Sequence, residues 1–385
     1  MSLLGNILGI RLNLLIGPSP VALPAPADVM SALADLEVKL TDSSESGFKL
    51  SINTGRTGPT DFLESPLIMH PQLQRGCRAI VTMIFDVIPY VIFDGIVTKR
   101  EYTPGSSSQS GVLTLFGRDL TMELDKEVKQ TEHPAMDETM IATLIAVSYA
   151  QFGMIPMALP PKFIDPPIPI DRVPQQNGTD WEYLQQMARR HGYETYIDPG
   201  PVPGVNTLYW GPPVKPGVPQ RTLTVDMGPA SDAYDVTTSE DDTVLTSVET
   251  KVIDRLTGAE MPVIALVGSG TPLGAVPETV ARFGSTRKEP IQTSGLNAGQ
   301  AMGRAQAKVD EGAKKAFTVS GTIDSTRYNA ALKARDMVFL RGAGLSYGGL
   351  YKVSEVRHLI RPGSYQQQFK LARGERGPLA PLVLP

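Results

Sequence analysis

The segments GGLYKVSEVRH (residues 348–358) and SYQQQFKLAR (residues 364–373) decide the fold class of this 385-residue chain. Apolar and polar side chains alternate along both segments, as they do in strands that bury one face. We expect a strand in each segment, and the same pattern predicts strands upstream at Phe317–Asp324 and Met337–Arg341. The C-terminal part of the chain is therefore predicted to be an antiparallel β region.

A similar pattern occurs nearer the N-terminus, where apolar residues alternate with polar ones over 36–40 and 48–52. The Ser-rich stretch Thr103–Ser110 has little to bury, which predicts an exposed hairpin loop. Frequent glycine (36) and proline (33) divide the sequence into short segments rather than long helices. We predict one antiparallel sheet or barrel here, with further strands at Arg78–Val87, Val91–Arg100 and Gly111–Gly117.

The pattern between these two β regions is that of helices. The apolar segment Asp137–Phe152 ends at Gly153, as a buried helix with a C-terminal glycine does. Thr179 and Glu182 have the spacing of a capping box, which predicts a helix over Asp180–His191. The middle of the chain is therefore an α/β insertion, which continues in two short predicted strands at Tyr193–Ile197 and Thr207–Trp210.

The second β region begins near Leu223, includes Val244–Ile253, and is interrupted by a Gly/Pro-rich segment at 257–296. Asn297 suits a helix N-terminus and predicts a helix over Asn297–Glu311. These patterns divide the chain into an N-terminal arm and linker (1–30), a first β region (31–125), an α/β insertion (126–222), a second β region (223–376) with its own insertion (257–315), and a C-terminal tail (377–385).

Charge and cysteine content limit the classes of partner and site. The net charge is −4 with no face-sized basic run, so we expect no nucleic-acid recognition. Cys77 is the single cysteine, which excludes an intrachain disulfide and fits folding in a reducing bacterial cytoplasm. Leu3–Ile16 is apolar but lacks a basic start and is too short to span a bilayer. We expect it to be a buried or partner-covered arm rather than a signal peptide, with no stable membrane insertion.

Candidate catalytic groups do not form a constellation. The four histidines are scattered, so we expect no metal site, and no cofactor motif is present because 268–271 and 342–344 have the spacing of turns. The carboxylate pairs Asp180/Glu182 and Asp241/Asp242 leave a hydrolase as an alternative. We expect no catalytic residue and no enzyme.

Three segments resemble those of one family. RVPQQNGTDWEYLQQMARRHGY (172–193), FDGIVTKR (93–100) and the closing segments quoted first are similar to stretches of phage late control protein D and of the hub part of VgrG-type spike proteins. The resemblance implies a β-rich α+β fold in which both β regions are antiparallel barrels like those of tail-tube proteins. It also implies a homotrimeric ring that serves as the baseplate hub of a contractile phage tail or injection system.

The same resemblance implies the partners. These are the tail tube protein, other baseplate proteins, and a separate spike protein, since the sequence ends at Pro385 soon after the closing strand. A peptidoglycan-degrading tail enzyme and a glycan-binding module remain alternatives. The residues expected to have structural or interface roles are Trp181, Tyr183, Leu184, Gly192, Tyr193, Tyr351, Val353, His358 and Tyr365.

Overall fold

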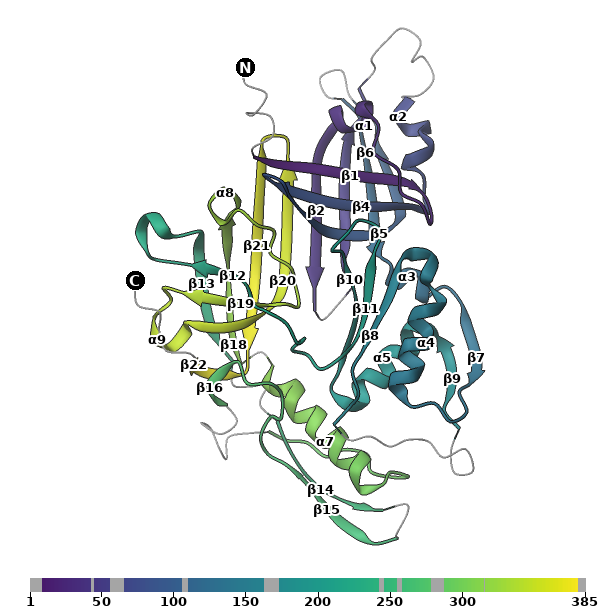
Figure 1. The fold of residues 1–385 in the computed structure, drawn as a ribbon, viewed down its shortest axis with the longest axis vertical. Helices are drawn as coiled ribbons and strands as arrows, with labels where there is room; N and C mark the ends of the chain where they lie inside the picture. The colour runs from purple at the N-terminus through teal and green to yellow at the C-terminus, as the bar shows by residue number, and fades with distance from the viewer. Residues whose placement is uncertain are drawn as a thin grey trace.

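The computed structural model describes residues 9–42, 45–55, 66–105, 110–162, 173–241, 246–254, 258–277, 287–314 and 316–379. Residues 1–8 of the predicted arm, the tip of the predicted hairpin loop at 106–109, Asp242 and the tail from 380 lie outside these ranges. Strands dominate, and among the described residues one sheet contains 12 of them (Figure 1).

The first half of this sheet is built from the N-terminal part of the chain. All the strands predicted there form. Its helical turns are α1 (Ala27–Ser31), α2 (Pro66–Met69) and η2 (Pro71–Leu73). Its strands are β1 (Ile10–Pro18), β2 (Leu33–Thr41), β3 (Gly47–Asn53), β4 (Cys77–Phe85), β5 (Ile88–Thr103) and β6 (Val112–Asp119).

Residues 10–18 of the N-terminal arm, which was expected to be buried or covered by a partner, belong to the large sheet. These residues form β1, which pairs antiparallel with β4 along its whole length and buries Leu14 and Ile16. The apolar side chains of this segment are covered by the chain's own core, so the segment forms a strand of the first half. In Figure 1, β1 and β4 cross β2 and β3 at a steep angle, so the sheet folds over its own apolar face.

The α/β insertion has its own core. Trp181, Leu184 and Met187 of α5 pack there against Ile141 of α4 and Trp210 of β11. The predicted helix over 137–152 ends as an α-helix at Ser148 and continues as a 3₁₀ turn before Gly153. The elements are α3 (Thr121–Leu124), β7 (Val128–Glu132), α4 (Glu138–Ser148), η3 (Ala150–Phe152), β8 (Met154–Ala158), β9 (Gln175–Thr179), α5 (Asp180–His191), β10 (Glu194–Pro199) and β11 (Asn206–Gly211).

The second half completes the large sheet. Its strands, four of them predicted, are β12 (Gln220–Thr224), β13 (Ala233–Glu240), β18 (Phe317–Asp324), β19 (Met337–Arg341), β20 (Gly349–Arg361) and β21 (Ser364–Arg373). The short η4 (Gly228–Ala230), α8 (Ser325–Tyr328), α9 (Gly344–Tyr347) and β22 (Glu375–Pro378) lie between and after them. One apolar core runs through both halves.

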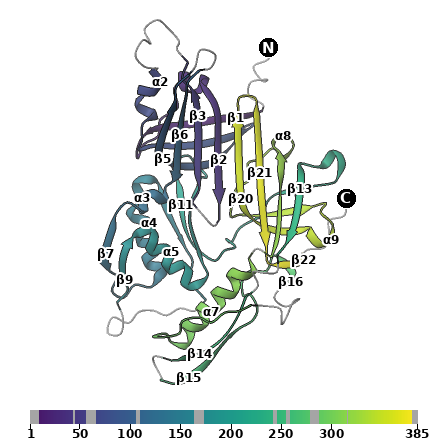
Figure 2. The same ribbon diagram turned by 180° about the vertical axis from the view of Figure 1, so that it is seen from behind.

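A small layer interrupts the second half between β13 and β18. It contains β14 (Thr246–Ile253), β15 (Glu260–Ala265), β16 (Gly274–Pro277), β17 (Arg287–Lys288) and α7 (Ala298–Ala313). The predicted start of this insertion at 257 is wrong, because β14 pairs with β15 and packs against α7 rather than joining the large sheet. Figures 1 and 2 show α7, β14 and β15 of this layer at the end of the molecule away from the N-terminus, and the helices of the α/β insertion closer to its middle.

The two halves repeat one strand order. The first runs β1-β4-β5-β6-β3-β2 and the second β12-β19-β20-β21-β18-β13, so the strands of each half follow the same path through the sheet in the same chain order. The outermost pair differs, being antiparallel for β1–β4 and parallel for β12–β19. Pairing of β2 with β20 joins the halves in one sheet. The chain is therefore an internal duplication with an insertion between its halves and another inside the second.

Candidate assembly surfaces

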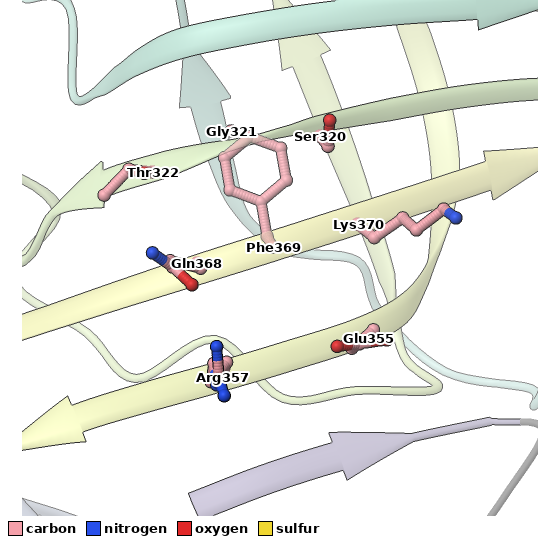
Figure 3. A pocket seen from close by; sticks show the side chains of 8 residues that line it. All are labelled: Ser320, Gly321, Thr322, Glu355, Arg357, Gln368, Phe369 and Lys370. Carbon is pink, nitrogen blue, oxygen red and sulfur yellow. The ribbon is translucent and has the colours of Figure 1, made fainter. Parts of the chain in front are cut away.

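A polar face extends over the central strands on the side away from the core. Alternation along β21 points Gln366, Gln368 and Lys370 outward while Phe369 and Leu371 are buried. Figure 3 shows a shallow depression of about 340 Å³ on this face, over β18, β20 and β21. It is lined by Ser320, Gly321, Thr322, Glu355, Arg357, Gln368, Phe369 and Lys370. The face carries hydroxyl, amide and mixed charged groups.

Four charged residues on this face form two ion pairs across the seam between the halves. Lys39 Nζ lies 3.3 Å from Glu355 Oε1, and Arg357 Nε lies 2.5 Å from Glu37 Oε1. Exposed ion pairs each contribute about 0–1 kcal/mol, so these pairs add little stability. Their main effect is to fix the register of β2 on β20 and to balance charge on the face.

His358 and Tyr365 meet beneath this seam. The Tyr365 hydroxyl and His358 Nδ1 are hydrogen-bonded at 2.8 Å, and the rings stack with 6.0 Å between centroids. Burial lowers the pKa of His358 to about 3, so the imidazole is neutral near pH 7. His358 Nε2 has no hydrogen-bond partner among the described residues. His358 is a buried packing residue.

Arg335 joins all three large parts of the chain. From the second half, its guanidinium donates to Thr41 O at 3.1 Å and to Ser46 Oγ at 3.1 Å in the first half. It also donates to Ile197 O at 3.3 Å in the α/β insertion and lies 4.4 Å from the ring centroid of Tyr196. Since Arg335 is buried, removal of its side chain would leave several acceptors without their donor.

A charged cluster lies at the same junction. Lys352 Nζ is 2.5 Å from Glu194 Oε2 and 3.6 Å from Asp42 Oδ2, and Lys314 Nζ is 3.3 Å from Glu194 Oε1. Burial alone would raise the pKa of Glu194, but the two lysines outweigh it and hold the pKa below its usual range. The cluster therefore keeps its charges inside the junction.

A second junction ties the first half to the α/β insertion. Arg78 and Asp94 form a buried bidentate pair, with nitrogen–oxygen distances of 2.8 and 2.7 Å. Asn206 Nδ2 donates to the same carboxylate at 2.9 Å and to Phe152 O at 3.0 Å. Arg78 also donates to Phe152 O, so the pair holds the start of β11 against the sheet.

Most of the predicted site residues pack the interior of the chain. Tyr351 and Val353 are buried in the large core, and the Tyr351 ring lies 4.3 Å from the Arg373 guanidinium carbon. Gly192 ends α5 at φ 66°, and the half-buried Tyr193 donates its hydroxyl to Pro160 O. The others that are buried are Trp181, Tyr183, Leu184 and His358. Their side chains are not available to another subunit.

Sequence reasoning missed the junction residues. Arg335, Lys352 and Arg78 bind groups far away in the sequence, so no local motif marks them. The one signal available was the occurrence of charged residues inside apolar strands, as at Arg78 in β4 and Lys352 in β20.

The carboxylates of the Asp180/Glu182 pair, one of the two pairs that suggested a hydrolase, have structural partners. Glu182 Oε2 accepts from Thr179 N at 3.1 Å, which completes the predicted capping box of α5. Asp180 is buried and accepts from Lys129, Tyr149 and Gln176. No group of histidine, cysteine and carboxylate side chains within the described ranges is placed to hold a metal ion. In the same ranges no helix is long and apolar enough to cross a membrane.

No family model and no curated protein matches the sequence. Solved structures do match the fold. A tail protein from Neisseria meningitidis superposes with a TM-score of 0.63 at 15% identity, over 95% of this chain and 97% of that one. A 43 kDa tail protein of prophage MuSo2 from Shewanella oneidensis gives 0.64 at 11% identity, over 95% and 99%. The chain has the fold of a phage tail protein.

The tail-protein fold extends to secretion machines. The E. coli c3393 protein, a component of the type VI secretion system, matches with a TM-score of 0.51 at 11% identity, over 97% of this chain and 80% of that one. A VgrG complex from Francisella gives 0.54 at 8% identity, over 98% and 55%. These likenesses concern the fold, and they agree with the fold that the resemblance in the sequence implies.

Proposed function

We propose that the chain is a homotrimeric baseplate hub that adapts a hexameric tail tube to a trimeric spike and lines the central channel. The observation that carries this proposal is the repeat of one strand order in both halves. Three copies supply six similar halves, which suits a sixfold partner on one side. Each copy has one α/β insertion and one small layer, so the same ring offers threefold features to the spike.

The polar face suits the lining of a channel. Its hydroxyl, amide and charged groups stay hydrated, and acidic and basic side chains alternate on it, with two ion pairs among them. The face therefore presents no apolar patch and no large field of one sign to what passes. Lys370 is the position that tests this role. A bulky polymer attached through Lys370→Cys should allow particles to assemble but block passage. The same polymer at Lys288→Cys on the small layer should leave passage intact.

Light scattering tests the hub itself. We expect the purified chain to have three times its monomer mass and to enter tail particles when tube, spike and other baseplate proteins are supplied. A stable monomer that never enters a particle would contradict the proposal. Peptidoglycan cleavage abolished by Glu182→Gln would support the enzyme instead, and saccharide binding by a monomer would support the glycan-binding module.

A further inference from the structure

Several strands of the large sheet have an edge with no strand beside it in the described part of the chain, among them β13 and the later part of β5. β13 pairs with β18 on one side only. β5 pairs with β4 through residues 88–96 and with β6 through residues 95–103. Along residues 98–103, the edge of β5 that faces away from β6 therefore has no partner strand. Such edges are templates for pairing with another chain. The side chains along them are exposed, with Lys99 at 65% and Glu101 at 48%.

The duplication relates these edges to a pairing already present in the chain. β13 holds the position in the second half that β2 holds in the first, and β5 holds the position of β20. Within the chain, β2 pairs antiparallel with β20 to join the halves. The two unpaired edges are therefore the counterparts of two strands that pair with each other.

A shared β-bulge aligns the two halves residue by residue. The register of β5 on β6 shifts at Thr98, and that of β20 on β21 shifts at Ser354. At both bulges the side-chain hydroxyl donates to the facing strand, from Thr98 to Phe116 O and from Ser354 to Lys370 O. Beside the bulges run two matching rows, Val97–Gly117–Phe48–Val38 and Val353–Leu371–Val319–Thr238.

These rows make Ser239 the counterpart of Lys39 and Glu101 the counterpart of Arg357. We propose that β13 of one copy pairs antiparallel with residues 99–103 of β5 in the next copy, in the register of β2 on β20. Because Lys39 faces Arg357 in the chain, Ser239 then faces Glu101 of the next copy. This inference rests on the proposed trimer and specifies the contact that closes it.

Charge supports this register. It sets Glu240 opposite Arg100 on one face and Asp241 opposite Lys99 on the other, so both acidic residues meet basic ones. Opposite charges directly across an antiparallel pair stabilise it, whereas like charges destabilise it. The contact is heterologous, since different edges meet, and such contacts form closed rings when the rotation between copies allows it.

A cysteine pair tests the register. Ser239→Cys with Glu101→Cys should form disulfides between copies under mild oxidation, giving covalent dimer and trimer and nothing larger. The matched control is Lys39→Cys with Arg357→Cys, which stand directly opposite inside one chain and should give a crosslinked monomer. The native Cys77 is buried and should not react.

A displaced pair completes the design. Ser239→Cys with Thr103→Cys is shifted by two residues along β5, which moves the thiols beyond disulfide reach, so we expect at least about tenfold less covalent trimer. If light scattering shows a trimer but the Ser239/Glu101 pair forms no disulfide, this contact is wrong and the hub proposal stands. If the unmodified chain is a monomer at every concentration, both are wrong.

Charge exchange gives a second measurement. Glu240→Arg should weaken the trimer, and adding Arg100→Glu should restore it, because the exchanged charges again attract. Glu240 also accepts from Tyr347 and pairs with Arg376 inside the chain, and Arg100 donates to Gln74 Oε1 and Ile68 O. The folded state of each variant is therefore checked by its thermal unfolding. Failure of the double variant to recover the trimer while both variants fold would contradict this register.

Discussion

Gly192 lies against Ala307 so closely that a Cβ added to it would stand 2.9 Å from the Ala307 Cα. Gly192 ends α5 with a left-handed backbone, φ 66°, and Ala307 belongs to α7 of the small layer. The glycine therefore meets two requirements at once, the turn that stops α5 and the approach of α7.

Gly192→Ala should destabilise the fold through both requirements. The left-handed backbone costs about 1–2 kcal/mol for a residue with a Cβ, and the contact with Ala307 adds about 1–3 kcal/mol. Gly76→Ala is the matched control, since Gly76 has φ 81° but open space around its Cα. Urea unfolding should show the larger loss at Gly192, and equal losses would contradict the packing argument.

Arg335→Lys should cost about 2–4 kcal/mol, because one ammonium cannot replace the donors to Thr41, Ser46 and Ile197 or stack on Tyr196. Arg361→Lys, at an exposed position, is the control and should change the free energy of unfolding by less than about 0.5 kcal/mol. The free energies of unfolding are measured by chemical denaturation. Similar losses for the two variants would contradict the proposal that Arg335 stabilises the junction.

Glu194→Gln should destabilise the junction by about 2–4 kcal/mol, because it leaves Lys352 and Lys314 near one another without the carboxylate that compensates them. The double variant Glu194→Gln/Lys352→Met should recover part of this loss. A double-mutant cycle on unfolding free energies measures the coupling. Additive losses would mean that the two side chains do not interact energetically.

His358 should make stability depend on pH between about 6.5 and 3. Its pKa is about 3 in the folded chain and 6.5 in the unfolded chain, so the unfolded state binds more protons in this range. The free energy of unfolding is therefore highest, as far as His358 is concerned, above pH 6.5, and it decreases as the pH falls below that value. The decrease has a slope of at most about 1.4 kcal/mol per pH unit.

The measurement compares wild type with His358→Gln between pH 6.5 and 5. The carboxyl groups are common to both proteins, so their contributions cancel in the difference between the slopes. We expect a shallower slope for the variant. Identical slopes would mean that His358 titrates in the folded chain as it does in the unfolded one.

Alternation of polar and apolar residues predicted most strands of both halves because it is a local signal, but it did not predict β1 or β13. The capping box at Thr179 and Glu182 likewise predicted α5 to the residue. Pairing partners were not predictable in this way. The joining of β2 with β20 and the placement of β14 in the small layer depend on segments far apart in the chain.

The candidate residues show the same limit. Tyr351 and His358 were predicted to have structural or interface roles, and both are buried in the chain. The pattern of a half-buried strand does not distinguish an apolar face that packs on the chain's own core from one that packs on another subunit. The duplication was visible in the sequence only as two β regions of similar size. It became evident through the strand order and the paired bulges, neither of which leaves a repeated motif.

The covalent link between the halves has a consequence for how a ring would form. The β2–β20 seam closes within one polypeptide, where the tether gives each strand a high effective concentration of its partner. The proposed β13–β5 seam has no such tether and depends on the collision of separate copies. In the proposed ring, the β2–β20 seams would form while each chain folds. The β13–β5 seams between copies would form later, at a rate that depends on the protein concentration.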